Sequence, residues 1–186
     1  MGLLQSLTGF LAQRLKLKVN GAKSAVARPW QRKFLGCSLT WHMRPKLRIA
    51  GASLGKLTAK VKALLRDARG RNLGTTIQTL NPVLRGWAAY FKLTETKRAL
   101  DERDGWIRHK LRCILWRQWK RPYARACNLM MRGLTEERAW RSVCNQRGPW
   151  WNAGASHMHA AFPKSWFAHL GLVSLLDTVQ PLPRVS

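Results

Sequence analysis

Acidic residues are scarce in this chain of 186 residues. Eight Asp or Glu stand against 34 Lys or Arg, which gives a net charge of +26 at pH 7, and the first acid is Asp67. Polymerases and nucleases hold divalent metals with clustered carboxylates, so no such cluster can form before Asp67. The nearest candidate, residues 101–104, opens a helix, and we interpret it as compensating the helix dipole and pairing with neighbouring cations. We therefore expect no catalytic residue, no metal site and no cofactor.

The chain also lacks long apolar runs and paired cysteines. No apolar run approaches the roughly 18 residues that indicate a membrane span, and no basic segment followed by an apolar block indicates a signal peptide. Cys37, Cys113, Cys127 and Cys144 form no C-x-x-C pair, which argues against a zinc ribbon or a thioredoxin-type site. We expect reduced cysteines in a cytoplasmic protein.

The chain does have an apolar core and a large positive charge. Apolar residues make up 46% of it, which excludes a disordered basic tail. So much charge of one sign opposes a compact fold, so a polyanionic partner is expected: nucleic acid first, and an anionic membrane surface only as a second choice that we do not adopt. The first 50 residues contain ten Lys or Arg and the residues from Gly148 onward only two. The part of the chain that contacts the polyanion should therefore end near Arg147.

Apolar spacing predicts a mainly α fold. Residues 53–70, 75–91 and 100–121 each place apolar side chains at three- and four-residue steps, on one face of a helix. Short connections between these segments predict a three-helix bundle over residues 51–122. In residues 1–50 the pattern predicts one helix and a few short strands. These would form a small α/β part with a hairpin near residues 34–49. In residues 123–186 the pattern predicts further helices.

Five motifs in these segments identify a family. They are F-L-G at residues 34–36, L-N-P-V-L-R-G-W at 80–87, Y-F at 90–91, D-G-W-I-R at 104–108 and W-R-Q-W-K at 116–120. Together they resemble the C-terminal part of bacterial group II intron-encoded reverse transcriptases. The region 51–122 is similar to the maturase-specific domain of that family, called domain X or the thumb. The G-P-W-W-N and G-L-V segments at 148–152 and 171–173 resemble the family's tail, and residues 1–50 resemble the end of its palm.

The sequence departs from the family pattern at three points. The Tyr-x-Asp-Asp turn that binds catalytic metals in the family is absent here, the Cys-rich endonuclease domain of some members is missing, and Cys37 stands where an aromatic residue is usual. The resemblance therefore implies a truncated or split protein. We expect it to keep the RNA-binding thumb, to lack the polymerase active site, and not to be an enzyme by itself.

The function that the resemblance implies is maturase-like binding of group II intron RNA. The RNA would perform the transesterifications, and the protein would stabilise its folded form through phosphate contacts. DNA or an RNA–DNA duplex also fits these contacts. Tryptophans interleaved with cations are typical of base-stacking platforms, although such side chains also fill cores. The residues that we expect to bind RNA are Lys60, Arg66, Arg85, Arg103, Arg108, Arg112, Arg117 and Lys120 for phosphate, and Trp116 or Trp119 for stacking.

Two alternatives stay open at this point. The chain could be the thumb half of a split RNA-directed DNA polymerase, completed by a separate palm and finger polypeptide, and an upstream frame encoding Tyr-x-Asp-Asp would favour this. It could instead be a non-functional relic whose incomplete sheet exposes unpaired strand edges and aggregates.

Overall fold

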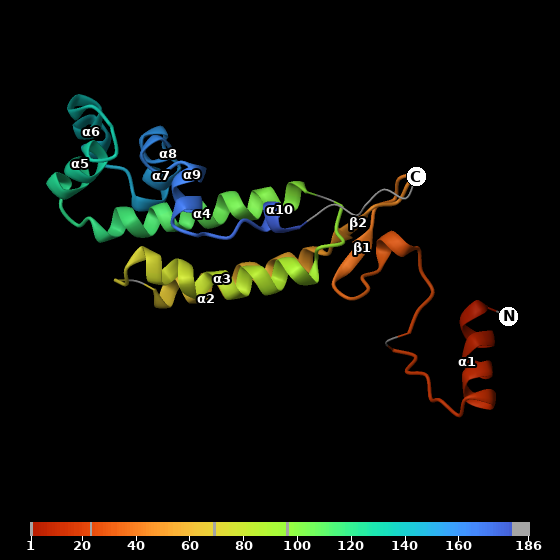
Figure 1. Cartoon of the computed structure of the whole chain (residues 1–186). Helices are drawn as coiled ribbons and strands as arrows, with labels where there is room; N and C mark the ends of the chain where they lie inside the picture. Colours follow the sequence, from red (N-terminus) through yellow and green to blue (C-terminus); the bar gives the residue numbers. More distant parts are fainter. Residues whose placement is uncertain (1, 23, 69, 96, 180–186) are drawn as a thin grey trace.

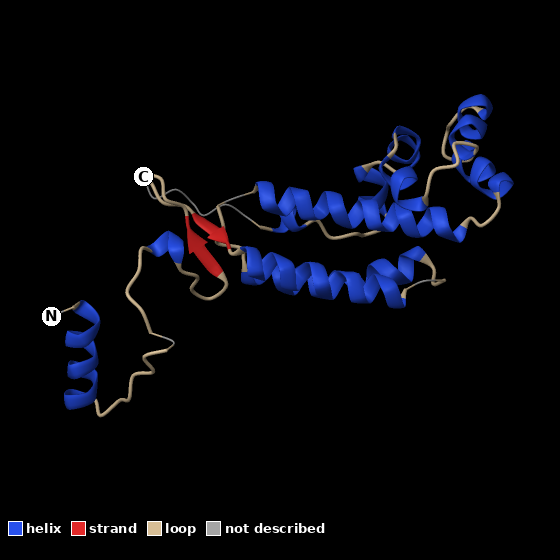
Figure 2. Ribbon diagram, turned by 180° about the vertical axis from the view of Figure 1, so that it is seen from behind, coloured by secondary structure: helices blue, strands red, loops and turns tan. Residues whose placement is uncertain are grey.

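The computed structural model describes residues 2–22, 24–68, 70–95 and 97–179. This part of the chain is mainly helical, with one two-stranded sheet near its N-terminal end (Figure 1, Figure 2). The predicted fold class is confirmed. The elements are α1 (Leu3–Arg14), the 3-10 turn η1 (Pro29–Gln31), β1 (Cys37–Leu39), β2 (Leu47–Ile49), α2 (Gly51–Asp67), α3 (Leu73–Tyr90), α4 (Arg98–Gln118), α5 (Pro122–Met130), α6 (Glu136–Val143), α7 (Pro149–Gly154), α8 (Ser156–Ala161), α9 (Lys164–His169) and α10 (Leu175–Thr178).

The centre of the molecule is the bundle of α2, α3 and α4. Helices α2 and α3 lie side by side, and α4 runs along them (Figure 1, Figure 2). Each helix turns its predicted apolar face into one shared core. Burial of each large aliphatic side chain contributes roughly 1.5–3 kcal/mol, so this core is the main source of stability. Its central members are Leu57, Val61 and Leu65 of α2, Ile77, Leu80 and Leu84 of α3, and Leu100, Ile107 and Leu111 of α4.

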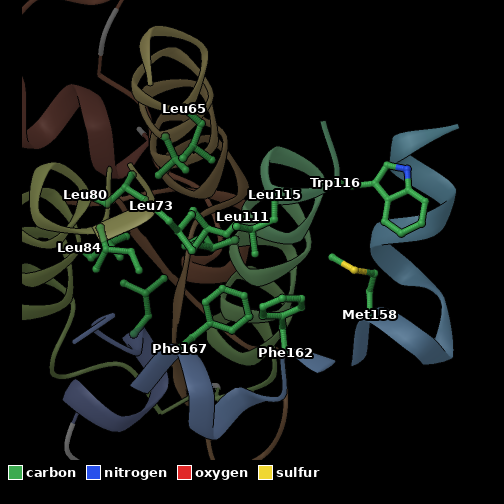
Figure 3. Packing of buried hydrophobic residues seen from close by; sticks show 14 of the residues in the cluster. Leu65, Leu73, Leu80, Leu84, Leu111, Leu115, Trp116, Met158, Phe162 and Phe167 are labelled. Atoms are coloured by element: carbon green, nitrogen blue, oxygen red, sulfur yellow. The ribbon is translucent and has the colours of Figure 1, made fainter. Parts of the chain in front are cut away.

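The shorter C-terminal helices extend that core over the far side of α4. Helix α7 packs on α4, and α5 pairs with α6 near the C-terminal end of α4 (Figure 1). Met158 of α8 faces Trp116 of α4, while Phe162 and Phe167 lie beneath Leu111 and Leu115 (Figure 3). The core runs without a break from Ile49 to Val179. The division at residues 50 and 122 therefore stays a prediction, and residues 180–186 of the predicted third segment lie outside the described residues.

Residues 171–176, which we name the strap, return along α3 and α4 and are held by two buried polar side chains. The amide of Asn81 donates to the Gly171 carbonyl at 2.8 Å and accepts from the Val173 N–H at 3.1 Å. The carboxylate of Asp104 accepts from the Ser174 hydroxyl at 2.7 Å and from two backbone N–H groups, those of Leu175 and Leu176, at 2.9 and 3.1 Å.

The acidic cluster at 101–104 therefore has two roles. Glu102 accepts from the Arg98 guanidinium at 2.9 Å, one turn away on the same helix, which confirms the expected pairing within the helix. Asp104 does not follow that interpretation, because it is buried and accepts hydrogen bonds from the strap. Its role is to fasten a distant segment to α4.

Residues 2–50, which we name the arm, contact the bundle through the hairpin. Strands β1 and β2 pair antiparallel, with Ser38 opposite Arg48. The Ser53 hydroxyl donates to the Gly36 carbonyl at 2.9 Å and the Tyr90 hydroxyl to the Leu35 carbonyl at 3.0 Å. Helix α1 stands away from the bundle in both views (Figure 1, Figure 2), and none of its described residues is buried.

Two expectations about the chemistry of the chain can be compared with the structure. All four cysteines fall in the described residues and are free. Among the helices of the described residues, none has the length and apolar character needed to cross a membrane.

Candidate nucleic-acid interface

A groove lies between the C-terminal end of α2, the connection at residues 70–72 and the C-terminal half of α4. It encloses about 610 Å³, and we name it the basic groove. Its wall on the far side of α4 is completed by Trp150, the second residue of α7. The lining residues are Lys62, Leu65, Arg66, Gly70, Arg71, Asn72, Lys110, Cys113, Ile114, Arg117, Gln118, Lys120 and Trp150.

The charge of the basic groove is entirely positive. Six of its lining residues are Lys or Arg and none is Asp or Glu. The nearest acid that pairs with one of them is Asp67, whose carboxylate is 4.0 Å from the Arg66 guanidinium, and both side chains are largely exposed. Such an exposed pair contributes little. The groove therefore presents cations that are available to neutralise phosphates and release counterions.

Helical spacing accounts for the positions of these cations. Lys62 and Arg66 are one turn apart on α2, and Lys110 and Arg117 are two turns apart on α4. Each pair therefore shares a face of its helix. The Gln118 amide donates to the Arg71 carbonyl at 2.8 Å, which joins the end of α4 to the α2–α3 connection. This bond links the two walls at one end of the groove.

The bottom of the basic groove is apolar. It includes Leu65 and Cys113, both buried, and the half-buried Ile114. Burial raises the pKa of the Cys113 thiol, an effect that the nearby charges of Arg117 and Lys110 oppose. The groove thus combines a cationic rim with an apolar floor.

Three of the predicted phosphate ligands, Arg66, Arg117 and Lys120, line the basic groove. Lys60 and Arg85 are exposed but lie outside it. Arg103 and Arg108 are half-buried and also lie outside it. Arg108 lines a smaller cavity of about 230 Å³ beside the strap, and Nε of Arg103 is buried with no hydrogen-bond partner among the described residues.

The prediction for Arg112 is wrong. Its side chain is only 3% exposed, and Nε and Nη2 both donate to the Phe162 carbonyl, at 3.0 and 2.7 Å. The guanidinium lies 5.5 Å from the Phe167 ring. Burial, together with the charge of Arg108, lowers the pKa of Arg112 to about 10. Arg112 joins α4 to the end of α8, and its burial keeps it away from RNA.

The prediction for Trp116 as a stacking residue is also wrong. Trp116 is 1% exposed and packs against the ring of His157 at 5.4 Å and the guanidinium of Arg125 at 4.9 Å. Trp119 is half-buried, with ring contacts to Trp116 and Phe162 at 6.5 and 5.7 Å. Stacking by Trp119 stays a prediction, and its position outside the groove lining does not favour it.

Six polar or aromatic residues of the groove were not among the predicted ligands. The signal for the two lysines was present, since each lies on the polar face of a predicted helix. No pattern in the sequence places Trp150 beside α4, because that contact depends on how α7 docks. The six residues are Lys62, Arg71, Asn72, Lys110, Gln118 and Trp150.

The histidines show no arrangement suited to binding a metal. The described residues contain no group of three or more His, Cys, Asp or Glu that could hold a metal ion. His157 is buried, and burial followed by the charge of Arg138 lowers its pKa to about 4. It is therefore neutral at pH 7 and belongs to the core.

Comparison with known families bears directly on this region. Residues 54–133 match the family model described as group II intron, maturase-specific domain. The match includes α3, α4, all of α2 but its first three residues, and every lining residue of the basic groove except Trp150. It confirms the resemblance for these residues. The search of curated proteins finds no match to the chain.

Proposed function

Since this chain carries the maturase-specific domain of group II intron proteins in residues 54–133, we propose that it binds group II intron RNA through the basic groove and assists splicing. The observation that carries the proposal is the charge of the groove. Six cations and no acid line one groove within the matched residues. Phosphate is the ligand that such a surface attracts most strongly.

The proposed role is binding rather than chemistry. Lys supplies a point charge, and Arg can donate two hydrogen bonds at once to one phosphate. Phosphate contacts of this kind fix the position of an RNA without reading its sequence. In this proposal the intron RNA carries out the transesterifications, and the protein lowers the repulsion between RNA segments that fold together. We assign the chain no catalytic residue and no polymerase activity of its own.

Two details of the proposal are the kind of nucleic acid that is bound and the compartment of the protein. DNA and RNA–DNA duplexes also present phosphates, so binding competition decides among them. The cytoplasm remains the proposed compartment, because all four cysteines are free thiols, as is usual in a reducing environment.

The test removes positive charge from the basic groove by mutation. The variant Arg66→Gln, Arg117→Gln, Lys120→Gln removes three cations of the lining. Binding to a group II intron RNA and to a length-matched unrelated RNA is measured over a salt series. If three phosphate contacts are lost, the slope of log K against log salt should become shallower by about 2 to 3. The wild type should keep its preference for the intron RNA at high salt.

The matched control neutralises three exposed cations of the arm, Arg14, Lys16 and Lys18, again to Gln. The change in net charge is the same, but the arm cations do not line the groove. We expect a smaller loss of affinity. Equal losses in the two variants, together with no preference for intron RNA, would contradict the proposal and indicate a generic polycation.

A second function is favoured by the exposed apolar residues of the arm. Phe34, Leu35 and Trp41 are all more than two-thirds exposed, and so is Leu3 of α1. An apolar surface of this kind is typical of contacts with another protein. It suits a thumb that joins a separate polypeptide carrying the polymerase palm. Co-expression with a neighbouring Tyr-x-Asp-Asp protein should then yield primer extension on an RNA template, and a complex without extension would count against this function.

A further inference from the structure

The floor of the basic groove is not explained by phosphate binding. Phosphates of a duplex meet the cations of a rim, whereas Leu65, Cys113 and Ile114 form an apolar recess between those cations. Bases of an A-form duplex are stacked inside it, and its deep major groove does not let side chains reach them. A duplex bound across the rim would leave the recess unfilled.

One aromatic ring stands at the edge of this recess. Trp150 lines the basic groove and is 46% exposed. Its ring lies 4.4 Å from Nζ of Lys110 and 3.9 Å from the ring of His109, whose Nε2 is 3.0 Å from the Trp150 carbonyl. The ring is therefore held in place by α4 while nearly half of the residue remains accessible.

The size of the recess fits a small ligand group. Pockets that enclose small molecules typically measure about 300–1,000 Å³. The basic groove, at about 610 Å³, falls within this range. Such pockets are lined mainly by apolar and aromatic groups with a few polar groups that fix orientation. Here the polar groups are cations, so the ligand combines an apolar flat part with negative charge.

An unpaired nucleotide has this combination. We propose that the basic groove receives an unpaired nucleotide of RNA, with its base between Trp150 and the apolar floor and its flanking phosphates on Arg66, Arg117 and Lys120. The inference rests on the proposed function in that the ligand is RNA. It adds that the site selects a bulge, loop or strand end over a continuous duplex, because only an unpaired base can leave its stack.

The experiment compares two blunt-ended RNA duplexes, each annealed from two strands, which differ by one unpaired nucleotide bulged from the middle. Neither duplex has a loop or an unpaired strand end. Binding is measured at one salt concentration by fluorescence anisotropy with the full chain. The wild type should prefer the bulged duplex. Trp150→Ala should weaken binding of the bulged duplex about tenfold, within the range found for loss of one base–aromatic stack, and should leave the continuous duplex unchanged.

Trp151→Ala is the matched control. Trp151 is adjacent in sequence, is 51% exposed, and lies 5.5 Å from the Arg147 guanidinium, but it does not line the groove. Its loss should affect binding of neither duplex. Trp150→Phe keeps an aromatic face and should retain most of the preference, which separates stacking from a packing defect. Thermal unfolding of each variant shows whether α7 still docks on α4.

Two results would overturn the inference. One is a wild type with no preference for the bulge, and the other is a Trp150→Ala variant that loses the same affinity for both duplexes. Either result leaves the proposed function standing if neutralising Arg66, Arg117 and Lys120 still weakens binding. If that variant also binds like the wild type, the groove is not the RNA site and both proposals fail.

Discussion

We name the rest of the described chain, residues 51–179, the body. The arm and the body share two features of their sequences but differ in how deeply their apolar side chains are buried. Both are rich in cations, and both place leucines at helical spacing. In the body, Leu80 and Leu84 of α3 are completely buried, whereas Leu3 and Phe10 of α1 are mostly exposed. An amphipathic pattern therefore predicts a helix, but it does not predict that another element covers the apolar face.

Length adds to this difference. Helix α1 has 12 residues. Isolated helices shorter than about 12–15 residues are marginally stable in water. Helices α3 and α4 have 18 and 21 residues and place buried side chains along most of their length. The folding free energy should therefore come almost entirely from the body. Three comparisons of variants test this difference between the arm and the body.

The largest effect is expected from a core leucine. Leu111→Ala should lower the free energy of unfolding by about 2–5 kcal/mol, because it removes buried methyl groups and leaves a cavity in the bundle. Leu7 of α1, in contrast, is 52% exposed. Leu7→Ala should therefore change the free energy of unfolding by only about 0.5 kcal/mol or less. Chemical denaturation measures both values. Similar losses would show that α1 packs on the body.

A somewhat smaller effect is expected where the strap is fastened. Asp104→Ala removes the acceptor of three hydrogen bonds and leaves the N–H groups of Leu175 and Leu176 unpaired. We expect a loss of about 2 to 4 kcal/mol. The corresponding contact of the arm is weaker, because Tyr90→Phe removes only the exposed bond to Leu35. That change should cost about 1 kcal/mol or less.

Asp101→Ala controls for the loss of charge in this comparison. Asp101 is exposed in the first turn of α4. Its interaction with the helix dipole there contributes at most about 1 kcal/mol. If Asp104→Ala were no worse than Asp101→Ala in thermal or chemical unfolding, the strap would not stabilise the body.

A third effect is a dependence of the free energy of unfolding on pH, which belongs to the body. Burial lowers the pKa of His157 to about 4 in the folded protein. In an unfolded chain the pKa of a His side chain is about 6.5. The stability due to neutral His157 is therefore fully present above about pH 6.5 and declines as the pH falls toward 4, by up to roughly 3 kcal/mol. His157→Leu should lose less stability than the wild type between those pH values. Parallel curves for the two proteins would show that His157 is accessible.

Much of the fold could be predicted from local patterns. The spacing of Leu57, Val61 and Leu65 and of Leu80 and Leu84 predicted the helices and their inward faces, and the structure buries all five. The hairpin near residues 34–49 also formed. These features depend on neighbours in sequence, which is why a single sequence reveals them.

The errors concern contacts between distant segments. Helical phase placed Arg112 and Trp116 among cations, but the docking of α8 buries both, one against the Phe162 carbonyl and one beside His157. The contacts of Asp104 with the strap and of Trp150 with α4 join residues that are far apart in the sequence. No local period carries that information, so much of the candidate site became visible only in the folded chain.

The hydrogen bond from Gln118 to the Arg71 carbonyl has a kinetic consequence. Because it links the two walls of the basic groove in the absence of RNA, it favours a site that is formed before binding. A preformed site avoids most of the ordering cost of binding. Association should then be limited by diffusion and by long-range attraction between the cations and the RNA, so the lifetime of the complex, rather than the rate of encounter, should distinguish a cognate RNA from others.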